Sequence, residues 1–257
     1  MGDDNLNFKI GDIVTRKSHN NDIAFKIISI DGNNVNLLGL NVRLKADAYI
    51  DDLILTKSAT DDYEIIQRNL VHSNLDRENY FYIPGKILHI DGDDEYLERC
   101  MNYYESMGIK ANGISIVEEL MPSKILELVK EYRPDIVVIT GHDAYYSKKN
   151  DYQNSNNFIL AIKNLRKYER SQEKLIIIAG ACQSNYEELI KAGANFASSP
   201  KRINIHALDP AIVATSIAFS SKNKSIDLIE LIDRTKYGSD GMGGIITNGT
   251  MYVGYPR

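Results

Sequence analysis

Two short runs of apolar residues constrain the fold of this chain most strongly. Residues 135–140 read DIVVIT and residues 175–179 read LIIIA, and both runs are almost free of polar side chains. Strands of this kind are typical of parallel sheets that are covered by helices on both faces. Apolar residues at helical spacing occupy 122–132, before the first run, and 158–168, between the two runs. The alternation predicts an α/β fold with a mostly parallel sheet flanked by helices.

The same alternation extends over most of the chain from residue 80 onward. Ser184 and Glu187 have capping-box spacing for a helix that Gly193 would end, and Asp209 followed by Pro210 has the pattern of a cap and a first-turn proline. Further strands are expected at 86–90, 114–117, 194–198 and 203–207, and further helices at 97–107, 184–192 and 209–218.

The N-terminal part of the chain has a different pattern. Residues 7–56 contain short β-branched runs separated by turn signals such as DGNN at 31–34, in which Gly and Asn tolerate positive φ. They predict a small SH3-like β-barrel. Residues 57–79 are polar and irregular apart from a short helical pattern over 63–70, and they are expected to form a linker. The predicted organisation is therefore a β-barrel domain at 1–56, a linker at 57–79 and an α/β domain at 80–257.

Composition excludes several classes of function. Thirty Lys and Arg against thirty-five Asp and Glu give a net charge of −5, which argues against nucleic-acid binding. Two cysteines and five histidines are too few for a disulfide scaffold or a Cys-rich zinc module, and no metal or cofactor is expected. No apolar run is long enough to span a membrane, and the N-terminus lacks a signal-peptide pattern. We expect a cytoplasmic protein whose oligomeric state the sequence leaves open.

A histidine and a cysteine follow the two apolar strands. His142 comes just after DIVVIT, in the segment GHDA, and Cys182 comes just after LIIIA, in the segment GACQS. The two residues are 40 positions apart, which accommodates a strand–helix–strand unit, so we expect a right-handed crossover between neighbouring strands. Functional groups collect at the carboxyl ends of parallel strands, and we expect both side chains at that edge of the sheet. Taken singly, each residue also fits a plain structural role, as a buried cysteine or a turn histidine.

This pair suits nucleophilic catalysis. A cysteine thiolate can attack a carbonyl and form a thioester, while an imidazole moves the proton to the leaving amine. A helix N-terminus beginning near Asn185 and a neighbouring imidazolium would both favour the thiolate of Cys182. The backbone N–H groups of Asp143 and Cys182 are the candidate oxyanion donors.

Several long segments resemble the YabG sporulation-specific protease family of endospore-forming bacteria. They are FKIGDIVTRKS, YFYIPGKILHIDGD, YRPDIVVITGHDAYY, LIIIAGACQSNYEELIKAGANFASSP and the terminal DGMGG. The resemblance implies a cysteine endopeptidase of the mother cell that cleaves spore-coat and cortex-lytic precursor proteins, commonly after arginine, and that processes itself. Protein substrates are thus the implied partners.

The two strand ends are also similar to those of the caspase, clostripain and legumain group of cysteine peptidases. This similarity implies a caspase-like fold, with His142 as the general base and acid and Cys182 as the nucleophile. That group usually has glycine directly after the histidine, whereas here Gly141 precedes His142 and Asp143 follows it. The departure bears on which amide completes the oxyanion hole.

Cleavage after arginine requires a carboxylate in the S1 pocket, because a guanidinium is best held by a bidentate acidic partner. The candidates are Asp91, Asp93 and Asp209, together with Asp94 and Asp143. Each also has a structural interpretation, since Asp209 fits a helix cap and Asp91 fits a plain turn.

A second hypothesis is a flavodoxin-like binding or signalling module without catalytic activity. It rests on the acidic segment HIDGDDEY at 89–96, which is similar to clusters that hold a metal or a phosphoryl group. This hypothesis assigns no function to the segment GACQS. Cys100 falls on the apolar stripe of its helix and is expected in the core, and His206 is expected to have a structural role. The glycines at 241–244 lack the Lys-Ser/Thr that a phosphate loop needs.

Overall fold

The computed structural model describes residues 8–70, 75–149 and 151–256. The chain divides into two compact units, Met1–Asp61 and Asp62–Arg257, which are described separately below. The division falls five residues beyond the expected end of the β-barrel domain at residue 56.

The N-terminal unit is an antiparallel five-stranded sheet in the order β4-β3-β2-β1-β5. Its core contains Val14, Phe25 and Leu37. Gly32 adopts φ 57° between β2 and β3, at the turn predicted from the DGNN pattern. Antiparallel pairing is as predicted, and closure into an SH3-like barrel stays a prediction. The strands are β1 (Ile13–Arg16), β2 (Phe25–Asp31), β3 (Asn34–Gly39), β4 (Lys45–Tyr49) and β5 (Leu53–Leu55), with 3-10 helices η1 (Lys17–His19) and η2 (Ile50–Asp52).

Part of the expected linker belongs to the second unit. Helix α1 (Asp62–Leu70) buries Ile65 in the core of that unit, and Asp62 forms an ion pair with Arg99 at 2.7 Å. These contacts join α1 to the second unit although the segment is polar in composition, and the domain bounds given above stay a prediction. Residues 71–74 of the expected linker lie outside the described residues.

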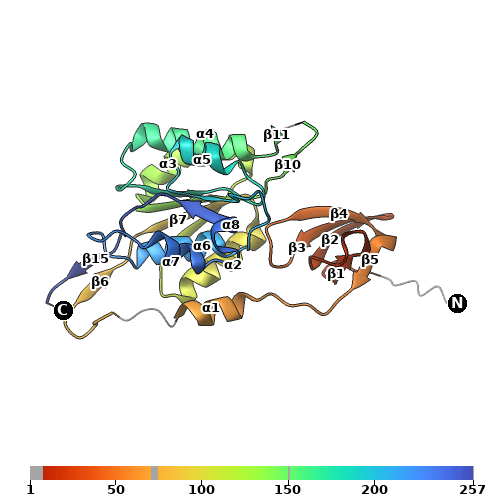
Figure 1. Ribbon diagram of the computed structural model, residues 1–257, viewed down its shortest axis with the longest axis horizontal. Helices are drawn as coiled ribbons and strands as arrows, with labels where there is room; N and C mark the ends of the chain where they lie inside the picture. The colour runs from red at the N-terminus through yellow and green to blue at the C-terminus, as the bar shows by residue number, and fades with distance from the viewer. Residues whose placement is uncertain (1–7, 71–74, 150, 257) are drawn as a thin grey trace. The chain divides into compact units, whose positions relative to one another are not determined.

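The second unit is built on a six-stranded sheet in the order β14-β13-β12-β9-β7-β8 (Figure 1). All its neighbouring pairs are parallel except β13 with β14. The predicted α/β class with a mostly parallel sheet is therefore confirmed. The strands are β7 (Ile87–Asp91), β8 (Ala111–Ser115), β9 (Ile136–Thr140), β12 (Ile176–Ala179), β13 (Phe196–Ser198) and β14 (Met242–Gly244).

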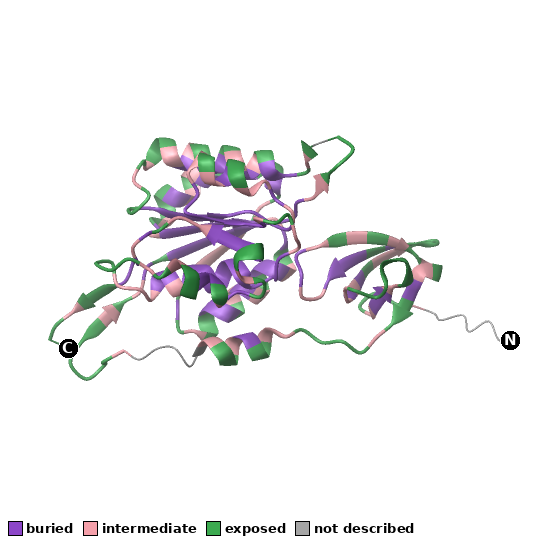
Figure 2. Cartoon of the chain, viewed as in Figure 1, coloured by how far each residue is buried: buried purple, intermediate pink, exposed green. Residues whose placement is uncertain are grey.

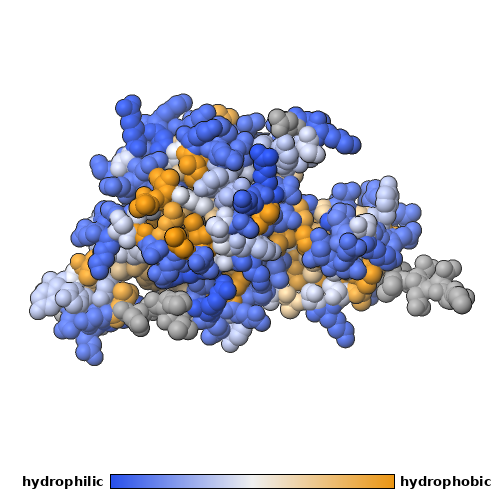
Figure 3. All heavy atoms as spheres, viewed as in Figure 1, coloured by the Kyte–Doolittle hydropathy of each residue, from blue (hydrophilic) through white to orange (hydrophobic). Residues whose placement is uncertain are grey.

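Helices cover both faces of this sheet, which explains why its central strands are apolar throughout. Val137 and Ile139 pack on the layer formed by α3 (Met121–Tyr132), α4 (Ser155–Tyr168) and α5 (Tyr186–Ala192). Val138 packs on the opposite layer, formed by α2 (Asp94–Ser106), α6 (Asp209–Ala218) and α7 (Leu228–Asp233). Figure 2 shows the buried sheet between these layers, and the surface over α4, at the top of the view, is mostly hydrophilic in Figure 3.

The remaining elements lie around this core. Strand β6 (Phe81–Ile83) pairs with β15 (Tyr252–Gly254) in a separate two-stranded ribbon. None of the helices in the described part of the chain is long and apolar enough to cross a membrane. The smaller elements are η3 (Glu118–Leu120), β10 (Tyr145–Tyr146), β11 (Asp151–Tyr152) and α8 (Gly238–Gly241).

Three local predictions are wrong. The segment 203–207 is not a strand, because Ser199 and Arg202 adopt positive φ and turn the chain before it. Ser184 does not cap α5; the cap is Asn185, and the Ser184 hydroxyl is used elsewhere, as described below. Asp209 is the first residue of α6 and not its N-cap.

Candidate active site

The strands that precede His142 and Cys182 are neighbours in the sheet. Strands β9 and β12 are parallel, with Ile139 opposite Ala179, so their carboxyl ends reach the same edge. His142 follows the end of β9 by two residues, and Cys182 follows the end of β12 by three. The predicted adjacency of these two strands is therefore present, and both residues leave the sheet at one edge.

A tight turn carries Cys182 out of β12. Gly180 adopts φ 110°, and a Cβ there would lie 3.2 Å from the Cβ of Ser198, so glycine is required. Gln183, directly after the cysteine, adopts φ 57°, which costs a non-glycine residue on the order of 1 kcal/mol. Its N–H donates to the carbonyl of Ile203 at 3.0 Å, which holds the turn. Such strain is common at functional sites, where the surrounding structure must maintain it.

The Cys182 sulfur is buried against the loop that follows β13. The backbone N–H of Ile205 donates to Sγ over 3.3 Å, and the carbonyl of the same residue lies 3.8 Å from Sγ. An N–H aimed at sulfur stabilises negative charge on it. Cys100 differs, because it lies within α2 in the core cluster, with Sγ 3.5 Å from the carbonyl of Ala207. The two cysteines are thus distinct in position, as expected from the sequence.

His142 is held on three sides. Its Nε2 lies 2.9 Å from Asp93 Oδ2, its backbone N–H donates to Glu118 Oε1 at 2.7 Å, and its carbonyl accepts from Asn154 Nδ2 at 2.9 Å. The ring of Tyr96 lies 5.6 Å away. His142 Nδ1 is buried and has no hydrogen-bond partner among the described residues. One ring nitrogen is therefore fixed, and the other remains available.

Glu118 was not identified from the sequence, although it supports the histidine loop. Its carboxylate lies where a Cβ at Gly92 or Gly141 would be, at 2.3 Å and 2.4 Å respectively. Both glycines are therefore needed to let the side chain approach the backbone of His142. The only sequence signal was the presence of these glycines directly after Asp91 and before His142, and it did not indicate which residue would fill the space.

Asp143 joins the two loops that carry His142 and Cys182. Its Oδ1 accepts from the N–H groups of Ala144 at 2.9 Å and Asn154 at 2.8 Å, and its Oδ2 accepts from the hydroxyls of Ser155 and Ser184. Burial raises the pKa of Asp143 above its ordinary value of 3.8, and these hydrogen bonds oppose the rise. The carboxylate of Asp143 is thus structural. The backbone N–H of Asp143 has no acceptor among the residues described.

The two serines extend this network into the cysteine turn. Ser184 Oγ accepts from the N–H of Ala181 at 2.9 Å, next to Cys182. Ser155 Oγ accepts from the N–H of Asn185 at 2.8 Å, at the start of α5. The Ser184 hydroxyl is therefore committed to Asp143 and the cysteine turn, which is why it does not cap the helix. Ser155 had no distinguishing pattern in the sequence.

The three candidate S1 carboxylates are all hydrogen-bonded within the second unit. Asp91 is fully buried and accepts from the hydroxyl of Thr140 at 2.8 Å. Asp209 is also fully buried and accepts from the N–H of His206 at 3.0 Å and of Lys236 at 2.9 Å. Asp93 contacts His142, as described above. An S1 role for each of them stays a prediction.

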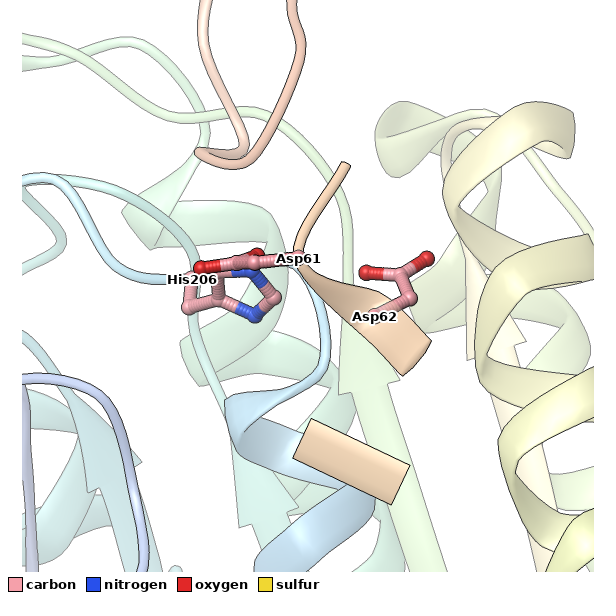
Figure 4. A group of neighbouring side chains, drawn as sticks. All are labelled: Asp61, Asp62 and His206. Atoms are coloured by element: carbon pink, nitrogen blue, oxygen red, sulfur yellow. The ribbon is translucent and has the colours of Figure 1, made fainter. Parts of the chain in front are cut away.

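His206 is buried and its Nδ1 accepts from the N–H of Leu208 at 3.1 Å. Figure 4 draws it with Asp62, whose two carboxylate oxygens are held by Arg99 at 2.8 Å and 2.7 Å. Asp61, which the figure also labels, ends the N-terminal unit. Because a guanidinium already neutralises Asp62, these contacts favour the structural role expected for His206 over metal binding.

Comparisons with known proteins bear on the family. A solved cobalamin-binding protein from Desulfitobacterium hafniense DCB-2 is 20% identical, and the match covers 49% of this chain and 55% of that protein. Its TM-score of 0.34 is too low to indicate a shared fold. The sporulation-specific protease YabG of Bacillus subtilis (strain 168) is 39% identical over 286 aligned positions, which cover 98% of this chain and 99% of the relative. The family described as YabG peptidase U57 matches residues 9–74 and 59–256. The chain therefore belongs to the YabG peptidase family.

Proposed function

We propose that this chain is a sporulation-specific cysteine endopeptidase with Cys182 as the nucleophile and His142 as the general base and acid. Membership of the YabG peptidase family supports a protease, and the Bacillus subtilis relative is a sporulation-specific one. The observation that carries the residue assignment is the pairing of β9 with β12, because it brings a histidine and a cysteine to one carboxyl edge of the sheet. The caspase-like placement of the two residues, one after each strand, is part of this proposal.

The proposed reaction has two halves. His142 takes the proton of the Cys182 thiol, and the thiolate attacks the scissile carbonyl carbon, whose oxygen takes the negative charge. The carbon–nitrogen bond then breaks, the amine leaves with the proton from His142, and the acyl group remains on sulfur as a thioester. Water then attacks the thioester after giving a proton to His142, and the thiolate is released with the new carboxylate. No cofactor is needed for either half.

Two backbone N–H groups are proposed as oxyanion donors, those of Asp143 and Cys182. The Asp143 N–H is supported by its lack of an acceptor among the described residues, whereas the carboxylate of the same residue holds the loop in place. An N–H group that makes no hydrogen bond in the resting protein can donate to the developing oxyanion of the substrate. It does not first have to break a hydrogen bond within the protein.

The proposed substrates are spore-coat and cortex-lytic precursor proteins in the mother cell, cleaved after arginine, together with the chain itself. Asp91, Asp93 and Asp209 are the proposed S1 carboxylates. The segment 68–76 contains Arg68 and is a proposed self-cleavage region, of which residues 71–74 lie outside the described residues.

A peptide library that varies the residue before the scissile bond tests this function. We expect the purified chain to cleave after arginine, with at least about 10-fold preference over lysine, because only a guanidinium binds a carboxylate through two parallel hydrogen bonds. Prior alkylation of thiols should stop the cleavage. Cleavage that resists alkylation would exclude the cysteine mechanism, and a preference for another residue would exclude the proposed S1 carboxylates.

A further inference from the structure

We propose that Asp93 is a positioning residue that fixes the ring and the tautomer of His142, so that Nδ1 is the nitrogen that exchanges protons with the Cys182 sulfur. This inference rests on the proposed function, which it deepens by assigning the atoms of the base. It also assigns Asp93, one of the candidate S1 carboxylates, to His142 and not to the S1 pocket.

The first support is the geometry of the Asp93–His142 contact. Asp93 Oδ2 lies 2.9 Å from His142 Nε2, and both side chains are at least nine-tenths buried. An ionised carboxylate can only accept, so Nε2 must carry the hydrogen. A neutral imidazole has one N–H, and Nδ1 then has a free lone pair, which is the state that a general base requires.

The second support is the fixed position of the Asp93 side chain. Its other oxygen, Oδ1, caps helix α2 by accepting from the N–H groups of Glu95 at 3.1 Å and Tyr96 at 3.2 Å. Its own N–H donates to Asp91 Oδ1 at 3.1 Å. Two backbone N–H groups thus hold Oδ1, and the contact with Asp91 fixes the main chain of Asp93, so the carboxylate has little freedom to rotate and can hold the imidazole in one orientation.

The third support is the unpartnered Nδ1. This atom is buried and has no partner among the described residues, although every other polar group of His142 that faces the protein is hydrogen-bonded. A buried polar atom without a partner is uncommon and requires an explanation. Proton transfer to the leaving amine supplies one, since the amine is present only during catalysis.

The substitution Asp93→Asn separates a positioning role from a structural one. Asparagine caps helices as well as aspartate does, so the fold should be retained. Its amide group, however, presents N–H to Nε2 and favours the tautomer with hydrogen on Nδ1. We expect kcat to fall about 10³-fold or more with little change in KM, as when the corresponding carboxylate of a serine protease is amidated.

Asp93→Ser is the matched control, because serine also caps α2 but is too short to reach His142 and donates nothing to Nε2. We expect it to lose less activity than Asp93→Asn. A role for Asp93 only as the cap of α2 predicts that both variants retain the wild-type kcat, and that result would overturn the proposal. A role in S1 predicts a loss confined to arginine substrates through KM, which would overturn it as well.

A spectroscopic measurement does not depend on activity. The ¹⁵N shifts of histidine-labelled protein, with the His142 signals assigned by their absence in His142→Gln, report which ring nitrogen carries the hydrogen. We expect hydrogen on Nε2 in the wild type and on Nδ1 in Asp93→Asn. The opposite tautomer in the wild type would overturn the positioning role even in an active peptidase, whereas the expected tautomer in a chain without thiol-dependent cleavage would show that the proposed function had failed instead.

Discussion

Replacing Cys182 with alanine is expected to reduce peptide cleavage to the background rate while the fold is retained. The sulfur is the atom that forms the thioester, and no other described side chain is placed to replace it, so the loss should be on the order of 10⁴-fold or more. The substitution removes one small buried atom, and the free energy of unfolding should change by only about 1 kcal/mol. Steady-state hydrolysis of an arginine peptide and a thermal melt measure the two effects.

Cys100→Ala provides the matched control for this experiment. It makes the same chemical change at another fully buried cysteine, which lies in α2 and contacts the carbonyl of Ala207. We expect a similar small loss of stability and full activity. Full activity in Cys182→Ala, or loss of activity in Cys100→Ala alone, would exclude Cys182 as the nucleophile.

Asp143→Ala is expected to cause the largest loss of stability. The substitution leaves two backbone N–H groups without their acceptor, the buried one of Asn154 and the part-buried one of Ala144, at a cost of about 1–3 kcal/mol for a buried group. The melting temperature should fall by about 5–15 °C. Activity should fall as well, because the hydroxyls of Ser155 and Ser184 no longer join the histidine loop to the cysteine turn.

The contribution of Asp143 should also depend on pH. Its pKa is raised by burial, so the folded chain binds this proton more readily than the unfolded chain does. The stability that comes from this titration is fully present below the unfolded value of 3.8 and is lost as the pH rises through the raised pKa. The difference in unfolding free energy between the wild type and Asp143→Ala should therefore decrease with rising pH in that window.

Asp151→Ala is the control for Asp143→Ala, because Asp151 is an exposed aspartate of the same loop region. We expect its melting temperature to stay within about 2 °C of the wild type, as for most exposed substitutions. An Asp143→Ala variant that melts like Asp151→Ala would show that the carboxylate does not support the two loops.

The sheet was predictable because its strands are apolar on both faces. DIVVIT and LIIIA became β9 and β12, and their adjacency followed from the crossover rule. The placement of His142 and Cys182 at one edge followed from these two strands alone. What the sequence showed, therefore, was the part of the site that depends on regular secondary structure.

The polar network around the site was not predictable in the same way. Ser184 had the spacing of a helix cap, but its hydroxyl donates a hydrogen bond to the carboxylate of Asp143, 41 positions away. The segment 203–207 was expected to form a strand, but the N–H of Ile205 donates to the Cys182 sulfur. Glu118 approaches His142 across two glycines. In each case a contact between residues far apart in the chain determines the local structure. Such contacts cannot be read from the local pattern of a single sequence.

Covalent labelling shows whether Cys182 is the reactive nucleophile. The purified chain is treated with a thiol-specific peptidyl electrophile ending in arginine, and the modified residue is identified by mass spectrometry of the digested protein. We expect rapid modification of Cys182 alone, slowed at low pH and in His142→Ala, with Cys100 unmodified. Modification of Cys100, or reaction of Cys182 no faster than in His142→Ala, would contradict this account.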